Sequence, residues 1–380
     1  MRRLLLLVLI ILVAYNTKPY WEEHIDPSIL EDTIAKLESF KEKPEVQDAL
    51  AGISDRISSI IYGLEDSLQE VKEEVKEPNN DAEAVEVSKP ELSKPEDQVF
   101  SVHNLEIGDT KEYVEQTVGT PVRSTVNEYG IEWHAYHQGY RNFLMVSFDE
   151  NDQVSALYTN QDLIASDSGI GLNSSKDEVH KTLGEPISKI RKGLVYYQLQ
   201  NDGEYEMYQR DDSYITVFYD KHENNTVTAL QIIDEDLEHA KKDIYSDGND
   251  GLKEGFEYQL FDLTNATRVN HGLPVLTWDE HVRSTARKHS LDMADNNYFN
   301  HTNLEGQSPF DRMQEDNITF TVAGENLAYG QFSSIFAHEG LMNSEGHRKN
   351  ILKEEYEFLG VGVAFNQESQ PYYTENFYRD

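Results

Sequence analysis

A short motif occurs twice in the middle of the chain, and this duplication limits the fold more than any other feature. The first copy runs from Lys111 to Pro121 and the second from Lys176 to Pro186. Lys, Val, Thr, Gly and Pro all match at one offset of 65 residues (176 − 111 = 65). A repeat at a fixed spacing indicates a duplicated supersecondary unit. We therefore expect two similar structural repeats, over about 103–160 and 168–235.

Each copy of the motif predicts a short helix that is followed by strands. Thr110 in the first copy, and Ser174 or Ser175 in the second, are suited to cap the helix N-terminus. Gly119 and Gly184 then end the helices, and the prolines that follow prevent their continuation. Runs rich in β-branched and aromatic residues predict strands over 131–136, 143–148, 154–158, 194–199, 205–208, 214–219 and 226–233. Together these elements predict an α+β domain with a mostly antiparallel sheet.

The repeat domain, which we place at 99–240, contains no evident catalytic constellation. His134 and His137 lie three residues apart in a predicted strand, so they are expected on opposite faces and form no catalytic pair. Each is expected to be a satisfied or surface histidine. Three nearby aromatic residues fit either the core or a binding face: Trp133, Tyr136 and Tyr140.

The beginning of the chain predicts export. Arg2 and Arg3 precede an apolar run from Leu4 to Tyr15, which is the layout of the charged and apolar regions of a signal peptide. The run is shorter than the ~20 residues that span a bilayer as a helix. No clear cleavage motif of small residues follows it. Residues 1–16 are therefore expected to act either as a signal peptide or as an uncleaved membrane anchor.

A stalk and a linker are expected between this segment and the repeats. Apolar residues recur every three or four positions within 17–76, which predicts a helical stalk. The pattern fits either a short coiled coil or an amphipathic helix that docks on its neighbour. Residues 77–98 are acidic, contain several prolines and include no aromatic residue. Such a segment cannot bury enough apolar surface to fold, so a disordered linker is expected.

The charge and composition of the chain exclude several classes of function. The net charge is -37 at pH 7, which argues against nucleic acid as a partner because phosphate binding needs a basic surface. The chain contains no cysteine, which excludes disulfides, a thiolate nucleophile and a cysteine-ligated metal. The nucleophile elbow of α/β-hydrolases, the P-loop and the dinucleotide fingerprint are also absent from the sequence.

The last third of the chain predicts helices that are layered on a small antiparallel sheet. Helical spacing of apolar residues covers 253–270 and 279–296. The second helix is expected to have Thr277 as its N-cap and Glu280 at the N3 position. The remaining predicted elements are short helices near 308–313 and 334–344 and a hairpin of strands over 358–365 and 371–378.

Six short motifs occur in order within this third. They are Leu-Pro-x-Leu-x-Trp, Tyr-Phe-x-His, Ser-Pro-x-Asp-Arg, Ala-Gly-Glu-Asn, Met-Asn-Ser-x-Gly-His-Arg-x-Asn-Ile-Leu and Gly-Val-Gly. Each is weak evidence alone, but their succession over 255–380 resembles the bacterial branch of the CAP superfamily, with its SCP/PR-1-like domain. The resemblance implies an α-β-α sandwich, which we place at 251–380.

The repeat domain has a resemblance of its own. It is similar to the associated domain that precedes CAP domains in Bacillus-type proteins. Its helix-plus-sheet unit also resembles the small units of outer-membrane assembly lipoproteins and β-lactamase-inhibitor proteins, which implies a binding module. The expected fold class is therefore α+β and multidomain, with a helical and disordered stalk, a two-repeat domain and a C-terminal CAP sandwich.

The resemblance to CAP domains implies a polar cleft that two histidines and two carboxylates line and that can hold a divalent metal. His301, Glu325 and His347 match three of these four positions. Ser344 stands where the second carboxylate falls, which removes one ligand. Chemically, two neutral imidazoles and one carboxylate form a workable first shell for zinc, with a fourth position open to water. The candidate metal ligands are thus His301, Glu325 and His347.

Three polar residues beside these ligands are candidate binding or orienting groups. Asn326 and Asn350 are suited to give orienting hydrogen bonds. Ser344 lies three residues before His347, so the two share one face if a helix continues that far. His338-Glu339 begins like a zincin motif, but a methionine occupies the second histidine position and excludes that class.

Three functions fit these observations. The first is an exported, cell-envelope-associated binding protein without enzymatic activity, with an envelope protein, polymer or lipid as its partner. The second is a metal-dependent hydrolase of peptide or cell-wall substrates, with Glu325 as general base and His301 and His347 on the metal. The third is a lipid-binding protein. The same residues also fit a structural polar cluster that ties loops together. Ser344 in place of a carboxylate favours the non-enzymatic binding protein.

Overall fold

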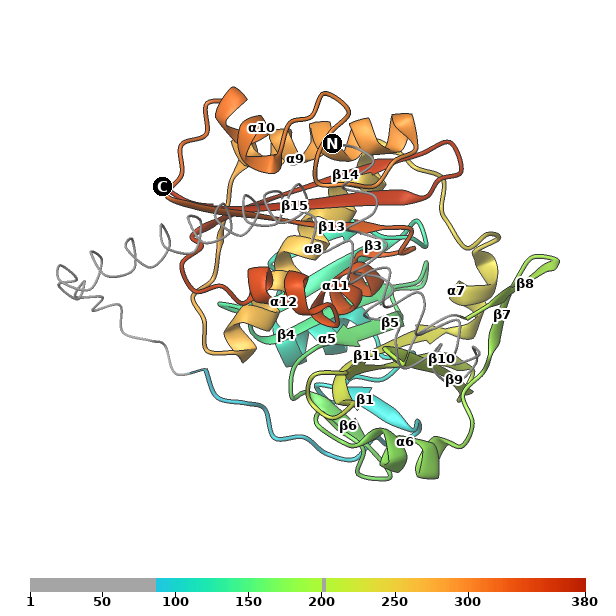
Figure 1. The fold of residues 1–380 in the computed structure, drawn as a ribbon. Coiled ribbons are helices and arrows are strands. Elements are labelled where there is room, and N and C mark those ends of the chain that lie inside the picture. Colours follow the sequence, from blue (N-terminus) through green and yellow to red (C-terminus); the bar gives the residue numbers. More distant parts are fainter. Residues whose placement is uncertain (1–86, 200–202) are drawn as a thin grey trace, which may run out of the picture. The chain divides into compact units, whose positions relative to one another are not determined.

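The computed structural model describes residues 87–199 and 203–380, which fall in one structural unit, Glu86–Asp380 (Figure 1). The predicted signal peptide or anchor, the stalk and the start of the linker, within 1–86, lie outside the described residues. In the described part of the chain, no helix is long and apolar enough to cross a membrane.

The described end of the predicted linker, residues 87–98, contains no helix or strand. It is nevertheless held by specific contacts. The backbone amides of Glu96, Asp97 and Gln98 all donate to the carboxylate of Glu106. This segment therefore follows a defined course where it enters the first repeat.

The duplicated motif forms two equivalent helices, α5 (Lys111–Val118) and α6 (Lys176–Leu183), as the sequence predicts. The hydroxyls of Thr110 and Ser175 each accept the amide of the third helical residue, which satisfies one of the free donors at a helix N-terminus. The glycine after each helix has a positive φ, which residues with a side chain rarely adopt.

Both repeats contribute to one antiparallel sheet of seven strands, in the order β2-β3-β4-β5-β11-β10-β9. The final strand, β11, pairs with β5 of the first repeat and β10 of the second, so it joins the two copies. The strands are β2 (Arg123–Val126), β3 (Glu132–Gln138), β4 (Arg141–Phe148), β5 (Val154–Thr159), β9 (Tyr205–Arg210), β10 (Ser213–Asp220) and β11 (Thr226–Asp234). One core contains apolar residues of α5, α6 and this sheet.

Several short elements of this half were not predicted. They are β2, the pair β1 (Phe100–Val102) and β6 (Ile164–Ser166), and α7 (Glu235–Ala240). The predicted strand 194–199 is confirmed as β8 (Val195–Gln198), but it pairs with β7 (Lys189–Lys192), which was not predicted, in a separate hairpin. The chain reverses between them at Gly193, whose φ of 56° a glycine adopts without strain.

The histidines and aromatic residues of β3 are engaged within the fold. Trp133 and Tyr136 are buried in the two cores on either side of the sheet. The Nδ1 atom of His134 lies 2.7 Å from the hydroxyl of Ser124, and His137 Nδ1 accepts the amide of Tyr140. The two histidines therefore have internal partners, and the two aromatic residues belong to the cores.

A second sheet, of four strands, has the order β12-β14-β15-β13. Only β12 runs parallel to its neighbour, and β14 and β15 form the predicted hairpin. The strands are β12 (Thr277–Trp278), β13 (Val322–Tyr329), β14 (Phe358–Phe365) and β15 (Pro371–Arg379). The helices of this half are α8 (Asp250–Asn270), α9 (Glu280–Asn296), α10 (Pro309–Glu315), α11 (Ser334–Met342) and α12 (Glu345–Ile351).

Helices cover both faces of this sheet, which confirms the expected α-β-α sandwich. On one face, Gly360 and Gly362 of β14 lie against the backbone of α9 so closely that a Cβ atom would approach it to 2.3 and 2.1 Å. On the other face, Phe256 and Leu260 of α8 share a core with Val361. The glycines of the Gly-Val-Gly motif therefore permit close helix–sheet packing.

One predicted helix cap is wrong. Asp279, not Thr277, is the N-cap of α9, and its side chain accepts the amide of Val282. Thr277 belongs instead to β12, because its amide pairs with the carbonyl of Glu357. The helix expected to end near Ser344 stops at Met342, and α12 begins directly after Ser344.

The two sheets are joined by a shared core. Leu263, Ala266, Ile335 and Phe336 from α8 and α11 pack with apolar residues of the seven-stranded sheet. Polar contacts surround this core: Arg123 pairs with Asp262, Tyr158 donates to Glu339, and Arg348 pairs with Asp220. The α-β-α sandwich and the repeat domain therefore pack as one body within the described residues.

Glu339 is expected to make the stability of this junction depend on pH. Burial raises its pKa from 4.5 to about 7, although the hydrogen bond from Tyr158 opposes the shift. A carboxyl whose pKa is raised in the folded state stabilises the fold at low pH, and that stability is lost as the pH rises from about 4.5 through 7. Glu339→Gln keeps an acceptor for Tyr158 and removes the buried charge.

We expect Glu339→Gln to be more stable than the wild type by roughly 2–3 kcal/mol at pH 8, with a smaller difference at pH 5. Urea denaturation at both pH values measures this. His338 is buried in both the wild type and Glu339→Gln. Its own contribution to the pH dependence of stability is therefore common to both proteins and cancels in the difference. Glu150→Gln, at an exposed position, is the control and should show no such pH dependence. A difference that does not grow with pH would contradict the assignment.

Candidate functional site

Glu325 lies at the centre of the predicted site, on the edge strand β13, and its side chain is only 1% exposed. Its Oε1 atom lies 2.9 Å from Nδ1 of His301, in the loop before α10. Its Oε2 atom accepts a hydrogen bond of 2.6 Å from Arg312. Both oxygens of the carboxylate are therefore engaged by neighbouring side chains.

Arg312 is the residue of this site that the sequence interpretation missed. It lies on α10, whose N-terminus is fixed by a capping box between Ser308 and Asp311. Besides the carboxylate, its guanidinium binds the carbonyl oxygens of His301 and Gln307 at 2.8 and 3.1 Å. Arg312 thus ties the loop that carries His301 to β13. Its signal was present in the Ser-Pro-x-Asp-Arg motif, as a charged residue on a short capped helix.

The second histidine, His347, is oriented by Ser344. Ser344 occupies the N-cap position of α12, yet its side chain makes no capping hydrogen bond. Its hydroxyl instead lies 2.9 Å from Nδ1 of His347. A serine cap normally stabilises a helix by about 1 kcal/mol, so this arrangement gives up a local stabilisation to hold the imidazole. Burial, and then the nearby His301, lower the pKa of His347, which is therefore neutral at pH 7.

Asn326 and Asn350 hold α12 against β13. Asn350 donates to the carbonyl of Glu325 at 3.2 Å and to the side chain of Asn326 at 2.9 Å. Asn326 in turn donates to the carbonyl of His347 at 3.2 Å and to the buried carboxyl of Glu375 at 3.0 Å. Asn326 is fully buried, so it acts on the site through the backbone rather than by contact with a ligand.

The two imidazoles have their inner nitrogens engaged by side chains and their outer nitrogens open. Nδ1 of His301 faces Glu325, and Nδ1 of His347 faces Ser344. Within 87–199 and 203–380, neither Nε2 atom forms a hydrogen bond. The His301 side chain is 51% exposed. Because its Nδ1 faces a carboxylate, the neutral form of His301 leaves Nε2 as an acceptor for a hydroxyl, an amide or a metal.

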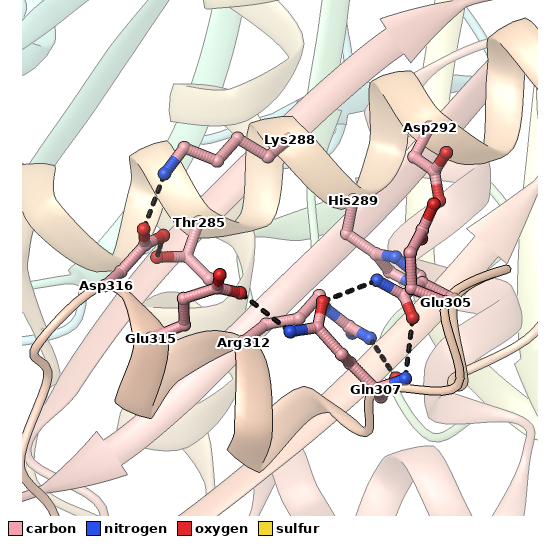
Figure 2. Close-up of a pocket in the computed structure, with 10 residues that line it drawn as sticks. Thr285, Lys288, His289, Asp292, Glu305, Gln307, Arg312, Glu315 and Asp316 are labelled. Carbon is pink, nitrogen blue, oxygen red and sulfur yellow. Dashed lines mark hydrogen bonds and ion pairs between the residues drawn. The ribbon is translucent and has the colours of Figure 1, made fainter.

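A pocket of about 360 Å³ lies on the other side of Arg312, between α9, α10 and the loop that contains Gln307 (Figure 2). Its walls are mostly charged and amide side chains: Thr285, Lys288, His289, Asp292, Asn303, Glu305, Gln307, Arg312, Glu315 and Asp316. Figure 2 shows Lys288 directed at Asp316 and Gln307 directed at Glu315, in agreement with their contacts of 2.6 and 2.7 Å. Arg312 therefore separates this pocket from Glu325.

His289, on α9, is a third histidine close to the site. It is 1% exposed, and its Nε2 atom lies 3.0 Å from the carbonyl of Asn300, next to His301. Burial lowers the pKa of His289, so the ring is neutral and donates this bond. His289 thus supports the loop that carries His301 and lines the pocket beside Arg312.

The metal assignment of His301, Glu325 and His347 stays a prediction, because the carboxylate of Glu325 is engaged by other side chains in this structure. Among the described residues, no group of three or more histidine, aspartate or glutamate side chains is placed to hold a metal ion. Glu325 carries the cationic Arg312 on one oxygen and His301 on the other. In this arrangement the described residues of the site leave the Nε2 atoms of His301 and His347 open to a divalent metal, whereas zinc typically has three or four protein ligands.

Two family models match the chain. The model described as CAP-associated N-terminal covers residues 107–244, and the model of the cysteine-rich secretory protein family, or CAP, covers residues 261–377. These ranges include the repeated motif and the site built around Glu325, respectively.

The chain is also similar to two proteins of Bacillus subtilis (strain 168). One, described as the uncharacterized membrane protein YlbC, is 31% identical over 290 residues, which cover 71% of this chain and 82% of that protein. The other, described as the uncharacterized protein YkwD, is 43% identical over 122 residues, which cover 32% of this chain and 46% of that protein.

Two crystal structures have the same fold. An extracellular protein with an SCP domain from Bacillus anthracis strain Ames superposes with a TM-score of 0.63 at 29% identity and covers 77% of this chain and 100% of its own. A cysteine-rich secretory protein from Staphylococcus aureus superposes with a TM-score of 0.58 at 14% identity, over 76% of this chain and 98% of its own, which shows the fold alone. The chain therefore belongs to the cysteine-rich secretory protein (CAP) family, in the group that carries a CAP-associated domain in front of the CAP domain.

Proposed function

We propose that the chain is a cell-envelope protein that binds a hydroxyl- or amide-bearing envelope polymer in its CAP cleft without hydrolysing it. The observation that carries this proposal is the state of Glu325, which is buried and bound on both oxygens by His301 and Arg312. The predicted export segment supports the location. So do two relatives, one described as a membrane protein and the other as extracellular.

Burial of Glu325 argues against the hydrolase. A general base must come within hydrogen-bond distance of the proton that it removes, directly or through one water. At 1% exposure, the Glu325 side chain is out of reach of such a water in this arrangement. Its position is instead that of a group that orients a histidine from behind, by accepting the Nδ1 proton. His301 then meets a ligand with Nε2, whereas Glu325 stays inside.

The remaining cleft groups suit hydrogen bonding to a polar ligand. The two Nε2 atoms are fixed in direction because each Nδ1 atom is held by a side chain, Glu325 for His301 and Ser344 for His347. Fixed donors and acceptors lose little entropy on binding, which favours recognition. Ser344, which stands where relatives are expected to carry a carboxylate, orients an imidazole without adding a negative charge to the cleft.

Sedimentation with purified cell-wall sacculi tests this proposal on the full chain. We expect His301→Ala/His347→Ala to lower the apparent affinity about tenfold or more, which corresponds to the loss of two hydrogen bonds of about 1 kcal/mol each. His281→Ala, at an exposed position on α9, is the matched control and should bind like the wild type.

The same samples distinguish binding from hydrolysis. With and without added Zn²⁺, soluble fragments released from the sacculi are measured by chromatography, and we expect no release above a sample without protein. Fragment release that Glu325→Gln abolishes would overturn the proposal in favour of the metal-dependent hydrolase. Binding that His301→Ala/His347→Ala leaves unchanged would remove the cleft as the binding site.

A further inference from the structure

The β7–β8 hairpin is a second candidate contact surface, separate from the CAP cleft. It forms a two-stranded sheet of its own and does not extend the seven-stranded sheet. Figure 1 shows it standing away from that sheet. Leu194, directly after the turn glycine, is 92% exposed, more than any other large apolar side chain of the described residues. Val195 and Tyr196 beside it are 51% and 60% exposed.

The two faces of the hairpin differ in composition. Ile190 and Lys192 point inward, with 4% and 2% exposure, and the Lys192 ammonium is neutralised by Glu238. The outward face carries Arg191 opposite Tyr196, and next to them Lys189, whose ammonium lies 4.7 Å from the centre of the Tyr196 ring. The exposed face therefore combines two cations and an aromatic ring behind an aliphatic tip.

This cationic face is unusual for the chain that carries it. The net charge of the protein is -37, but the segment 186–199 contains three basic residues and no acidic one. Beside the turn, the backbone carbonyl of Lys242 lies 3.4 Å from the position of a Cβ atom on Gly193, and the exposed pair Lys242 and Asp243 adds no net charge there. The hairpin is thus a local site for an anionic partner on an otherwise acidic protein.

In the first repeat, the strand that corresponds to β7 is covered by α8. The offset of 65 residues places β7 at the position of β2. In the first repeat, the backbone of Val126 in β2 lies directly against Gly255 of α8, and Gln259 donates to Thr125. The second copy has kept a hairpin at the equivalent place, but its outward face is exposed.

We propose that the outward face and tip of the β7–β8 hairpin dock on an anionic lipid surface. Leu194 and Val195 enter the interface, where aliphatic side chains leave water, and Tyr196 lies at the level of the headgroups. Lys189 and Arg191 pair with the lipid phosphates through side chains long enough to reach them from behind the tip.

Charge and size favour a lipid surface over a folded protein as the partner. The outward face and the tip of the hairpin together expose five side chains. A stable protein interface, in contrast, typically buries about 800 Å² on each partner. A fluid bilayer accepts a single apolar tip without a matching pocket. Repulsion between the acidic remainder of the protein and the bilayer is screened over about 8 Å at physiological ionic strength, so a projecting hairpin can make contact.

A fluorescent label at the tip tests the proposal in the full chain. Because the protein contains no cysteine, Leu194→Cys creates a single labelling site for an NBD fluorophore, whose emission rises and shifts to the blue on leaving water. The reference protein carries the label at Tyr113→Cys, a 45% exposed position on α5. Both proteins have the same N-terminal segment, so any anchoring that it provides is common to both.

We expect the label at position 194 to respond to vesicles of phosphatidylglycerol and phosphatidylcholine, and not to phosphatidylcholine alone. Lys189→Glu/Arg191→Glu should weaken this response about tenfold or more, since each cation near an anionic surface contributes about fivefold. Three outcomes would overturn the proposal: an equal response at position 113, an equal response to neutral vesicles, or a response that requires a second protein. None of these readouts depends on the CAP cleft, so they are independent of the sacculus experiment.

Discussion

Arg312→Ala is expected to lower the free energy of unfolding by about 3–5 kcal/mol, because it leaves a buried carboxylate without its cation. Glu325 is 1% exposed and Arg312 is 8% exposed, so water cannot replace the lost partner without opening the loop. The substitution also removes the hydrogen bonds that fix the carbonyls of His301 and Gln307. Urea denaturation, followed by tryptophan fluorescence, measures the loss.

Two further variants separate this pair from a general loss of contacts. Arg312→Met/Glu325→Gln removes both charges, so we expect it to recover a large part of the stability that Arg312→Ala loses. Lys288→Ala breaks the pair of Lys288 with Asp316. Because the Lys288 side chain is 64% exposed, this loss should cost less than about 1 kcal/mol. A cost for Arg312→Ala as small as that of Lys288→Ala would show that Glu325 is not held as the structure indicates.

This pair also explains why the chemistry of the site could be predicted only in part. The motifs gave His301, Glu325 and His347 as neighbours, and the structure places His301 beside Glu325 and within electrostatic influence of His347. The state of the carboxylate on β13 depends on Arg312, which approaches from α10. A sequence pattern identifies which groups are present, but it does not show which of them neutralise one another. The metal and binding assignments of these residues stay predictions.

Local signals in the sequence predicted the local structure well. The caps at Thr110 and Ser175 and the glycines after α5 and α6 were found because each depends on residues within one helical turn. Thr277 was assigned wrongly for a long-range reason. Its amide pairs with Glu357, far along the chain, and this pairing draws Thr277 into a strand and leaves Asp279 to cap the helix.

The packing of the two halves was not predicted, because almost nothing in the local sequence reports it. The core that α8 and α11 share with the seven-stranded sheet consists of ordinary apolar residues, such as Leu263 and Phe336, whose spacing predicts only an amphipathic helix. Which surface such a helix covers is decided by complementary shape. The one sequence feature that reports the contact is Gly255, a glycine inside a long helix, where glycine is otherwise unfavourable.

Gly255→Ala is expected to lower the free energy of unfolding by about 3 kcal/mol or more. A Cβ atom at this position would lie 2.0 Å from the carbonyl oxygen of Val126 and 3.0 Å from its carbonyl carbon. These are backbone atoms of β2, so the clash cannot be relieved by a side-chain rotation and must move α8 away from the sheet. Gly346→Ala is the matched control, because nothing lies within 4 Å of its Cβ position on α12.

The two glycine variants should differ in sign as well as in size. In Gly346→Ala the helix gains an alanine without a clash, which favours stability by about 0.5–1 kcal/mol. In Gly255→Ala the displaced helix also loosens the segment before it, where Tyr245 donates to the carbonyl of Gly330 and Ser246 to that of Glu128. Limited proteolysis within 241–249 should therefore become faster in Gly255→Ala alone. If cleavage and unfolding of this variant match the wild type, α8 does not rest on β2, and the repeat domain and the CAP sandwich do not share the core described above.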